Sequence, residues 1–141
     1  MSPALLAAAV RGWIGTPYRH RAATRGAGCD CLGLVAGVWR DLYGTDPPDL
    51  PPYRADWRDG RYAGELQALA ETWLVPEAGP PAAGMVLLFR LGPSVLPRHC
   101  GIAVGGGRFV HAQERLGVVE GHLGDGWLRR VAGVWAFPEI D

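Results

Sequence analysis

The chain has 141 residues, of which 48% are hydrophobic and 20% are charged, so it is long enough for one globular domain and is not disordered. Its 14 basic residues balance 14 acidic residues, and this neutral charge argues against a nucleic-acid partner held by a broad basic face. Lysine is absent and serine occurs only at Ser2 and Ser94, which excludes Schiff-base chemistry and a P-loop and disfavours a serine nucleophile.

The N-terminal segment shows neither a membrane span nor a convincing secretion signal. It has no basic start, and no apolar run in the chain approaches the roughly 20 residues of a span. We expect the alanine-rich stretch Pro3–Trp13 to form the first helix of the protein. Gly15-Thr-Pro-Tyr18 then breaks the helix and opens a loop that runs to Gly28.

Two further helices are expected in the first half of the chain. Apolar residues repeat at helical spacing from Cys31 to Tyr43, with Asp30 in the N-cap position and Gly44 at the C-terminal end. A third helix is expected over Arg61–Leu74. The intervening segment Asp46–Tyr53 is rich in proline and predicts a surface loop.

The second half of the chain is typical of β-strands. Short apolar segments are separated by glycine-rich turns, and helices followed by a run of antiparallel strands favour an α+β fold. The expected strands are Met85–Arg90, Cys100–Val104, Arg108–Ala112, Gly117–Glu120 and Val131–Phe137.

The glycines Gly105–Gly107 predict a tight hairpin between two of these strands. A three-residue loop places Gly101 opposite His111, and His99 opposite Gln113. The two histidines then share one face of the sheet as diagonal neighbours, and Gly101 between them leaves space for a substrate or for another helix. A two-residue loop would instead put the histidines on opposite faces.

Cys31 is the candidate nucleophile, because the first turn of a helix favours a thiolate and its unpaired N–H groups can stabilise an oxyanion. A histidine base oriented by another polar group would complete a cysteine hydrolase. The residues alone leave open a merely buried cysteine and two unrelated histidines. A zinc site of Cys29, Cys31, His99 and Cys100 lacks the usual ligand spacing. With three cysteines one thiol must stay free, which points to a reducing compartment or a working thiol.

Four blocks of the sequence occur in the order of a known family. They are Gly15-Thr-Pro-Tyr18, Asp30-Cys31-Leu-Gly-Leu-Val35, His99-Cys-Gly-Ile102 and Phe109-Val-His-Ala112. These blocks resemble the pattern G-T-P-Y, D-C-S-G-L-V, H-V-G-I and F-I-H-A of the NlpC-type cell-wall cysteine peptidases, relatives of papain in a rearranged order. The resemblance runs from about Gly12 to Phe137. It implies an α+β, papain-like fold with the nucleophile at a helix N-terminus packed on an antiparallel sheet.

The resemblance implies hydrolysis of peptide bonds in peptidoglycan stems, commonly next to γ-D-glutamate, with no cofactor and no metal. Cys31 would be the nucleophile, His99 the general base and His111 the residue that orients His99. Papain uses asparagine in the orienting position, but this chain contains none. Gln113 is therefore the alternative third member.

Other residues are matched to the substrate and oxyanion site by the same resemblance. Tyr18 corresponds to the family tyrosine that lines the nucleophile, and Asp30 and Leu32 flank Cys31. Leu32 stands where the family has a serine that lines the substrate cleft. Arg19-His20-Arg21 stands where the family has an aromatic-Gly-Gly segment. The cluster of Arg19, Arg21 and Arg25 is a candidate to bind stem-peptide carboxylates, although such a cluster is most often a solvated loop.

The variant Gly28-Cys-Asp-Cys-Leu-Gly-Leu34 resembles a phage-tail and gene-transfer-agent branch of the family. We expect residues 1–141 to form a single catalytic domain with no separate wall-binding domain. It would be made in the cytoplasm and built into the tail or baseplate of a phage-like particle, where it opens the target cell wall locally for DNA delivery. Pro47–Trp57 is the candidate docking segment, because a rigid proline loop loses little entropy on binding.

Three other functions remain open at this point. The chain would also suit a catalytically idle structural component of such a tail, or an acyltransferase that uses the same cysteine and histidine. The third is an amidase of the N-acetylmuramoyl-L-alanine type. The loop after Ile14 resembles the peptidases rather than the acyltransferases, and the catalytic groups do not distinguish a peptidase from an amidase.

Overall fold

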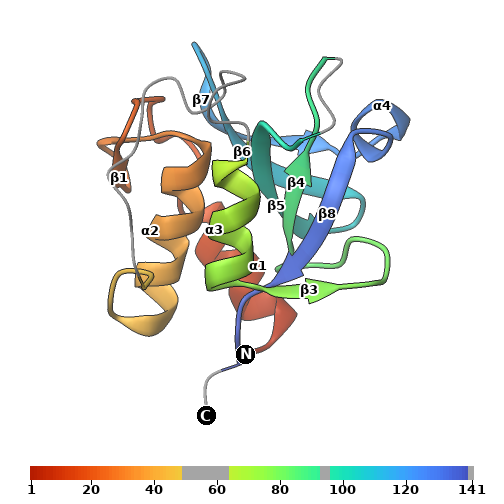
Figure 1. The fold of residues 1–141 in the computed structure, drawn as a ribbon. Coiled ribbons are helices and arrows are strands. Elements are labelled where there is room, and N and C mark those ends of the chain that lie inside the picture. The colour runs from red at the N-terminus through yellow and green to blue at the C-terminus, as the bar shows by residue number, and fades with distance from the viewer. Residues whose placement is uncertain (49–63, 93–95, 140–141) are drawn as a thin grey trace.

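A computed structural model of the chain describes residues 1–48, 64–92 and 96–139. Helices cover one face of a six-stranded antiparallel sheet whose strand order is β3-β8-β4-β5-β6-β7 (Figure 1). Within the described ranges no helix has the length and apolar character needed to cross a membrane. The helices are α1 (Pro3–Arg11), α2 (Cys31–Tyr43), α3 (Glu65–Trp73) and α4 (Asp125–Leu128), and the strands are β1 (Ala23–Thr24), β2 (Gly28–Cys29), β3 (Val75–Glu77), β4 (Val86–Phe89), β5 (His99–Gly105), β6 (Arg108–Gln113), β7 (Gly117–His122) and β8 (Val131–Ala136).

Helix α2 has the bounds predicted from its cap residues. Asp30 accepts a hydrogen bond from the Gly33 N–H at 2.7 Å, and Gly44 ends the helix in the left-handed conformation, with φ of 78°. The other two predicted helices are shorter than expected. Helix α1 ends at Arg11 instead of Trp13, and α3 begins at Glu65, after Gly64.

Parts of two predictions lie outside the described residues. The start of the predicted third helix falls in residues 61–63, and most of the docking segment Pro47–Trp57 falls in residues 49–63. The buried face of α3 is as predicted, because Leu66, Ala70 and Trp73 are buried against the rest of the core.

The five predicted strands are confirmed as β4 to β8, with ends displaced by no more than two residues. The sequence did not predict β1, β2, β3 or α4. The pair β1 and β2 forms a small hairpin within the predicted loop, and β3 is an exposed edge strand paired with β8. Segments of two to four residues carry too little hydrophobic periodicity to be recognised.

The sheet carries a hydrophobic core on each face. The main core lies between the sheet and helices α1, α2 and α3. A second core on the opposite face joins Leu87, Phe89 and Phe109 to Trp127 of α4. Because both faces are covered, β4 is apolar throughout instead of alternating.

Two glycines let the N-terminal elements approach α2 closely. A Cβ at Gly37 would lie 2.1 Å from the indole of Trp13, whose Nε1 donates to Asp41 at 2.8 Å. A Cβ at Gly33 would lie 1.9 Å from the carbonyl oxygen of Ala22. The loop before β1 is thereby held against the first turn of α2, where Cys31 lies.

The hairpin between β5 and β6 has the predicted register at the histidines, although its loop differs. Gly105 pairs with Arg108, so the loop has two residues and not three. A β-bulge between Ala103 and Gly105 offsets this difference, and Ile102 pairs with Val110 as expected. His99 and His111 consequently lie on one face of the sheet, as predicted.

Candidate active site

Cys31 is the first residue of α2 and is 2% exposed. The Asp30 N–H donates to the Ala22 carbonyl, and the Gly33 N–H donates to the Asp30 side chain. The N–H groups of Cys31 and Leu32 have no acceptor within the helix, because they belong to its first turn. The helix N-terminus therefore offers both a thiol and two backbone donors suited to an oxyanion.

His99 and His111 form a buried pair beside this helix end. His99 Nε2 lies 2.8 Å from His111 Nδ1, and the side chains are 6% and 2% exposed. His99 also hydrogen-bonds with the thiol of Cys31, although the histidines and the helix are on opposite faces of the sheet. The contact is possible because His99 is the first residue of β5, at the end of the sheet. With Nε2 engaged by His111, Nδ1 of His99 is the nitrogen left for Cys31.

The surroundings of Cys31 favour its thiolate. Burial by itself raises the pKa of this thiol, but hydrogen bonds from Cys100 and His99 and the charge of His99 outweigh burial. The net effect holds the pKa of Cys31 well below its usual value. A lowered thiol pKa next to a histidine is the environment that a cysteine nucleophile requires.

The other two thiols are held in the protonated form. Hydrogen bonding with Cys31 and burial raise the pKa of Cys100, whose Sγ also lies 3.2 Å from the Cys31 carbonyl oxygen. Burial and the charges of Asp30 and Cys31 raise the pKa of Cys29 to about 12. All three cysteines are unpaired, so Cys31 is distinguished by its environment.

Within the described ranges, no three His, Cys, Asp or Glu side chains are arranged to hold a metal ion.

His111 is kept neutral by its surroundings. Burial, and then the charge of His99, lower the pKa of His111 to about 3. Its second ring nitrogen, Nε2, lies 3.0 Å from Gln113 Nε2. The two residues predicted to orient His99 thus belong to one series of contacts, in which His111 contacts His99 directly and Gln113 contacts His111.

An open cleft of about 240 Å³ lies next to His99. Trp127 forms one wall, with its ring centroid 5.9 Å from that of His99 and 5.2 Å from that of His111. The sequence did not predict this role, because Trp127 belongs to a four-residue helix without a periodic apolar pattern. The cleft is lined by Leu91, His99, Ala112, Gln113, Glu114 and Trp127.

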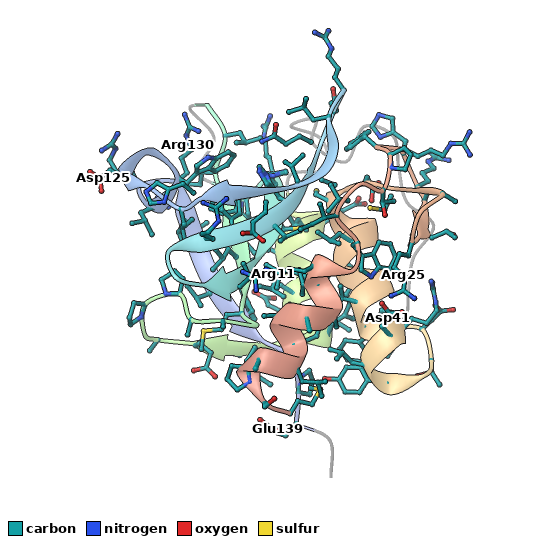
Figure 2. All side chains as sticks on the ribbon, turned by 180° about the vertical axis from the view of Figure 1, so that it is seen from behind. Arg11, Arg25, Asp41, Asp125, Arg130 and Glu139 are labelled. Atoms are coloured by element: carbon teal, nitrogen blue, oxygen red, sulfur yellow. The ribbon has the colours of Figure 1, made fainter. Side chains whose placement is uncertain are left out.

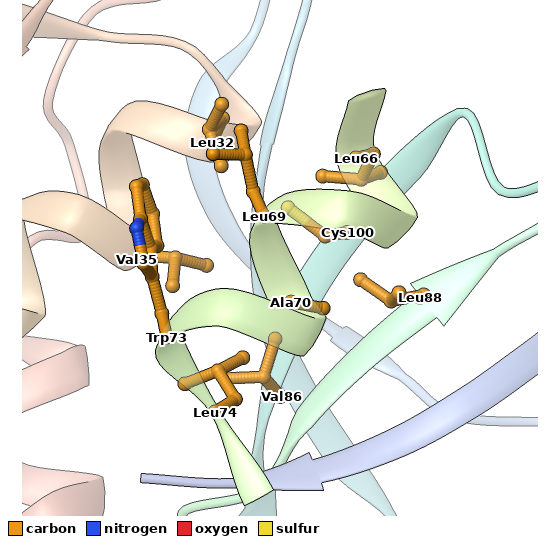
Figure 3. A pocket seen from close by; sticks show the side chains of 10 residues that line it. All are labelled: Leu32, Val35, Leu66, Leu69, Ala70, Trp73, Leu74, Val86, Leu88 and Cys100. Carbon is orange, nitrogen blue, oxygen red and sulfur yellow. The ribbon is translucent and has the colours of Figure 1, made fainter. Parts of the chain in front are cut away.

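The side chain of Leu32 does not line this cleft, contrary to expectation. Its side chain is buried beneath α3 in an apolar pocket, together with Leu66, Leu69 and Cys100 (Figure 3). The pocket has a free volume of only about 10 Å³, and apolar atoms line it. It is therefore a packing gap in the core and has no room for a substrate group.

Asp30 supports the fold of the site rather than the substrate. Its two carboxylate oxygens accept hydrogen bonds from the backbone N–H groups of Gly33 and Arg21, at 2.7 and 3.0 Å. Burial and the charge of Cys31 raise the pKa of Asp30 to about 6. Tyr18 lies beside the nucleophile segment through a β-bridge to Cys29.

Two arginines of the loop before α2 have partners in the structure. Arg25 extends towards Asp41, with Nη1 3.8 Å from the carboxylate (Figure 2). Arg21 adopts a φ of 62°, and its backbone N–H donates a hydrogen bond to Asp30.

The space beside Gly101 is occupied, because a Cβ there would lie 3.1 Å from both Phe109 and His111. Gly101 thus permits close packing of the hairpin and leaves no room for substrate or helix.

The site places a thiol of lowered pKa at a helix N-terminus, next to a histidine that contacts a second histidine. Cysteine hydrolases use groups of these types in this layout. The chain belongs to the NlpC/P60 family, whose sequence profile matches residues 15–136. It is similar to the murein DD-endopeptidase MepS/murein LD-carboxypeptidase of Escherichia coli, with 30% identity over 107 residues. That match covers 76% of this chain and 47% of the relative, so the chain spans about half the length of this curated protein.

Solved structures confirm the predicted NlpC-type α+β fold. The NlpC/p60 domain of the peptidoglycan hydrolase SagA matches 99% of this chain and 100% of its own length, with a TM-score of 0.60 and 22% identity. An NlpC/P60 family protein from Bacillus cereus has a TM-score of 0.67 and 19% identity, over 97% of this chain and 40% of its own.

Proposed function

We propose that this chain is a cysteine peptidase that hydrolyses stem peptides of peptidoglycan, cutting next to γ-D-glutamate. The observation that carries the proposal is the contact chain from the Cys31 thiol through His99 to His111 at the start of α2. The thiolate would attack the scissile carbonyl, and the N–H groups at the helix end would stabilise the oxyanion. Protonated His99 would then donate its proton to the leaving amine.

Digestion of purified peptidoglycan, followed by mass analysis of the soluble products, tests this substrate and bond. The proposal expects products cleaved between γ-D-glutamate and the diamino acid. Cleavage of the D,D cross-link, the bond named for the Escherichia coli relative, would overturn the choice of bond but keep the peptidase. Release of intact stem peptides from the sugar would identify an amidase. No cleavage at all would favour the idle structural component.

We further propose that the protein acts from within a phage-like particle, as a tail or baseplate component that opens the wall for DNA passage. The support is the motif variant around Cys29 and Cys31, which resembles the phage-tail and gene-transfer-agent branch. An antibody to this chain should detect it in purified particles from the producing cells. Detection solely outside the particles would contradict this role.

A further inference from the structure

Gln113 is the last residue of β6 and contacts the side of His111 that faces away from His99. Its Nε2 lies 3.0 Å from His111 Nε2, whereas His111 Nδ1 lies 2.8 Å from His99 Nε2. The rings of Phe109 and Trp127 cover the imidazole, with centroids 4.3 and 5.2 Å away, and neither ring offers a hydrogen-bond acceptor. The hydrogen bonds of His111 therefore run to His99 on one side and Gln113 on the other.

The position of one proton on His111 decides whether His99 can become charged. Neutral His111 carries a single ring proton, on either Nδ1 or Nε2. When His99 takes the proton of Cys31, the sulfur keeps its electron pair and both ring nitrogens of His99 carry hydrogen. The Nε2–H of His99 then needs an acceptor. His111 Nδ1 is that acceptor only if the His111 proton is on Nε2.

The two orientations of the Gln113 amide have opposite effects on which ring nitrogen of His111 carries the proton. With Oε1 towards His111, it accepts a hydrogen bond from Nε2–H and leaves Nδ1 free to accept from His99. With Nε2 towards His111, which is the orientation in this structure, it donates to the ring, places the proton on Nδ1 and opposes a charged His99. A half-turn of the side-chain amide exchanges the two, because its oxygen and nitrogen ends have nearly the same shape.

We propose that Gln113 is a positioning residue whose amide orientation sets the tautomer of His111, and thereby the protonation of the Cys31–His99 pair. The oxygen-inward orientation supports the thiolate and imidazolium, and the nitrogen-inward orientation supports the thiol and neutral imidazole. This inference rests on the proposed cysteine peptidase chemistry. It assigns to the contact chain a fourth member that acts through His111 and does not touch the reacting atoms.

Two substitutions test whether the side-chain oxygen of Gln113 matters as a hydrogen-bond acceptor, or whether only the size of the side chain matters. Gln113→Met keeps the length but removes the amide, and should lower kcat by about 10–100-fold. It should also reduce the ultraviolet absorbance of the Cys31 thiolate at neutral pH. Gln113→Glu keeps an oxygen acceptor and should retain most of both signals. Gln67→Met on α3, where the glutamine bonds Glu71 at the surface, is the matched control and should behave as wild type.

Ring-nitrogen NMR of His111 in the wild-type protein gives a readout that needs no substrate or variant. The proposal expects the Nε2–H tautomer when Cys31 is a thiolate, and the Nδ1–H tautomer there would overturn it. Equal losses in Gln113→Met and Gln113→Glu, or wild-type activity in Gln113→Met, would also overturn it. Because the NMR and thiolate signals do not involve peptidoglycan, a wrong substrate assignment would leave them unchanged.

Discussion

Replacement of Cys31 by alanine is expected to lower the rate of peptidoglycan hydrolysis by at least about 10⁴-fold, because no other group in the contact chain can form the acyl intermediate. The variant should remain folded, since the change removes one small side chain at the start of α2 and leaves the Asp30 cap in place. Release of soluble fragments from purified peptidoglycan measures the activity, and thermal unfolding measures the fold.

Cys29→Ala is the matched control for this experiment. Cys29 is two residues away and fully buried, but burial and nearby charges raise the pKa of its thiol to about 12. Its loss should therefore affect packing and leave most of the hydrolytic activity. An essential Cys29 with a dispensable Cys31 would show that the nucleophile has been assigned to the wrong thiol.

His111→Ala is expected to lower kcat by about 10²–10⁴-fold, because His99 loses the group that accepts its Nε2–H and fixes its ring. KM should change little, since His111 is 2% exposed and lies behind His99. Steady-state kinetics on a soluble stem peptide separates the two quantities.

Cys31 should remain alkylatable by iodoacetamide in His111→Ala, but more slowly at neutral pH, because the charged form of His99 that accompanies the thiolate loses its hydrogen-bond acceptor. His122→Ala, at the exposed end of β7 in the same sheet, is the control and should match the wild type. Unchanged kcat in His111→Ala would remove His111 from the catalytic arrangement.

Local signals in the sequence were sufficient for much of the site. An aspartate before an amphipathic segment predicted where α2 begins, and so placed Cys31 at a helix N-terminus. A register based on an assumed three-residue loop predicted that His99 and His111 share a face; the loop has two residues, and a β-bulge restores that register. The first inference holds because helix capping depends on neighbouring residues, whereas the second also depends on the β-bulge.

Features set by tertiary structure were not predicted. The position of Trp127 over the histidines depends on α4, which is only four residues long and packs on the second core. The direction of the Leu32 side chain depends on α3, which covers it from a distant part of the chain. The β-bulge that preserves the hairpin register was not predicted either, because the three consecutive glycines next to it do not indicate where a bulge lies.

The central claim is that Cys31 is activated by its contact with the histidine pair. The pH dependence of iodoacetamide alkylation, followed residue by residue with peptide mapping, tests this claim most directly. An ordinary cysteine, with a pKa of about 8.5, loses about tenfold in reactivity for each pH unit below that value. The lowered pKa of Cys31 predicts that its alkylation stays near the plateau well below this range, whereas Cys29 and Cys100 remain unlabelled. The claim would be contradicted if the alkylation rate of Cys31 fell with pH as that of an ordinary thiol does. It would also be contradicted if Cys29 or Cys100 were labelled at a lower pH than Cys31.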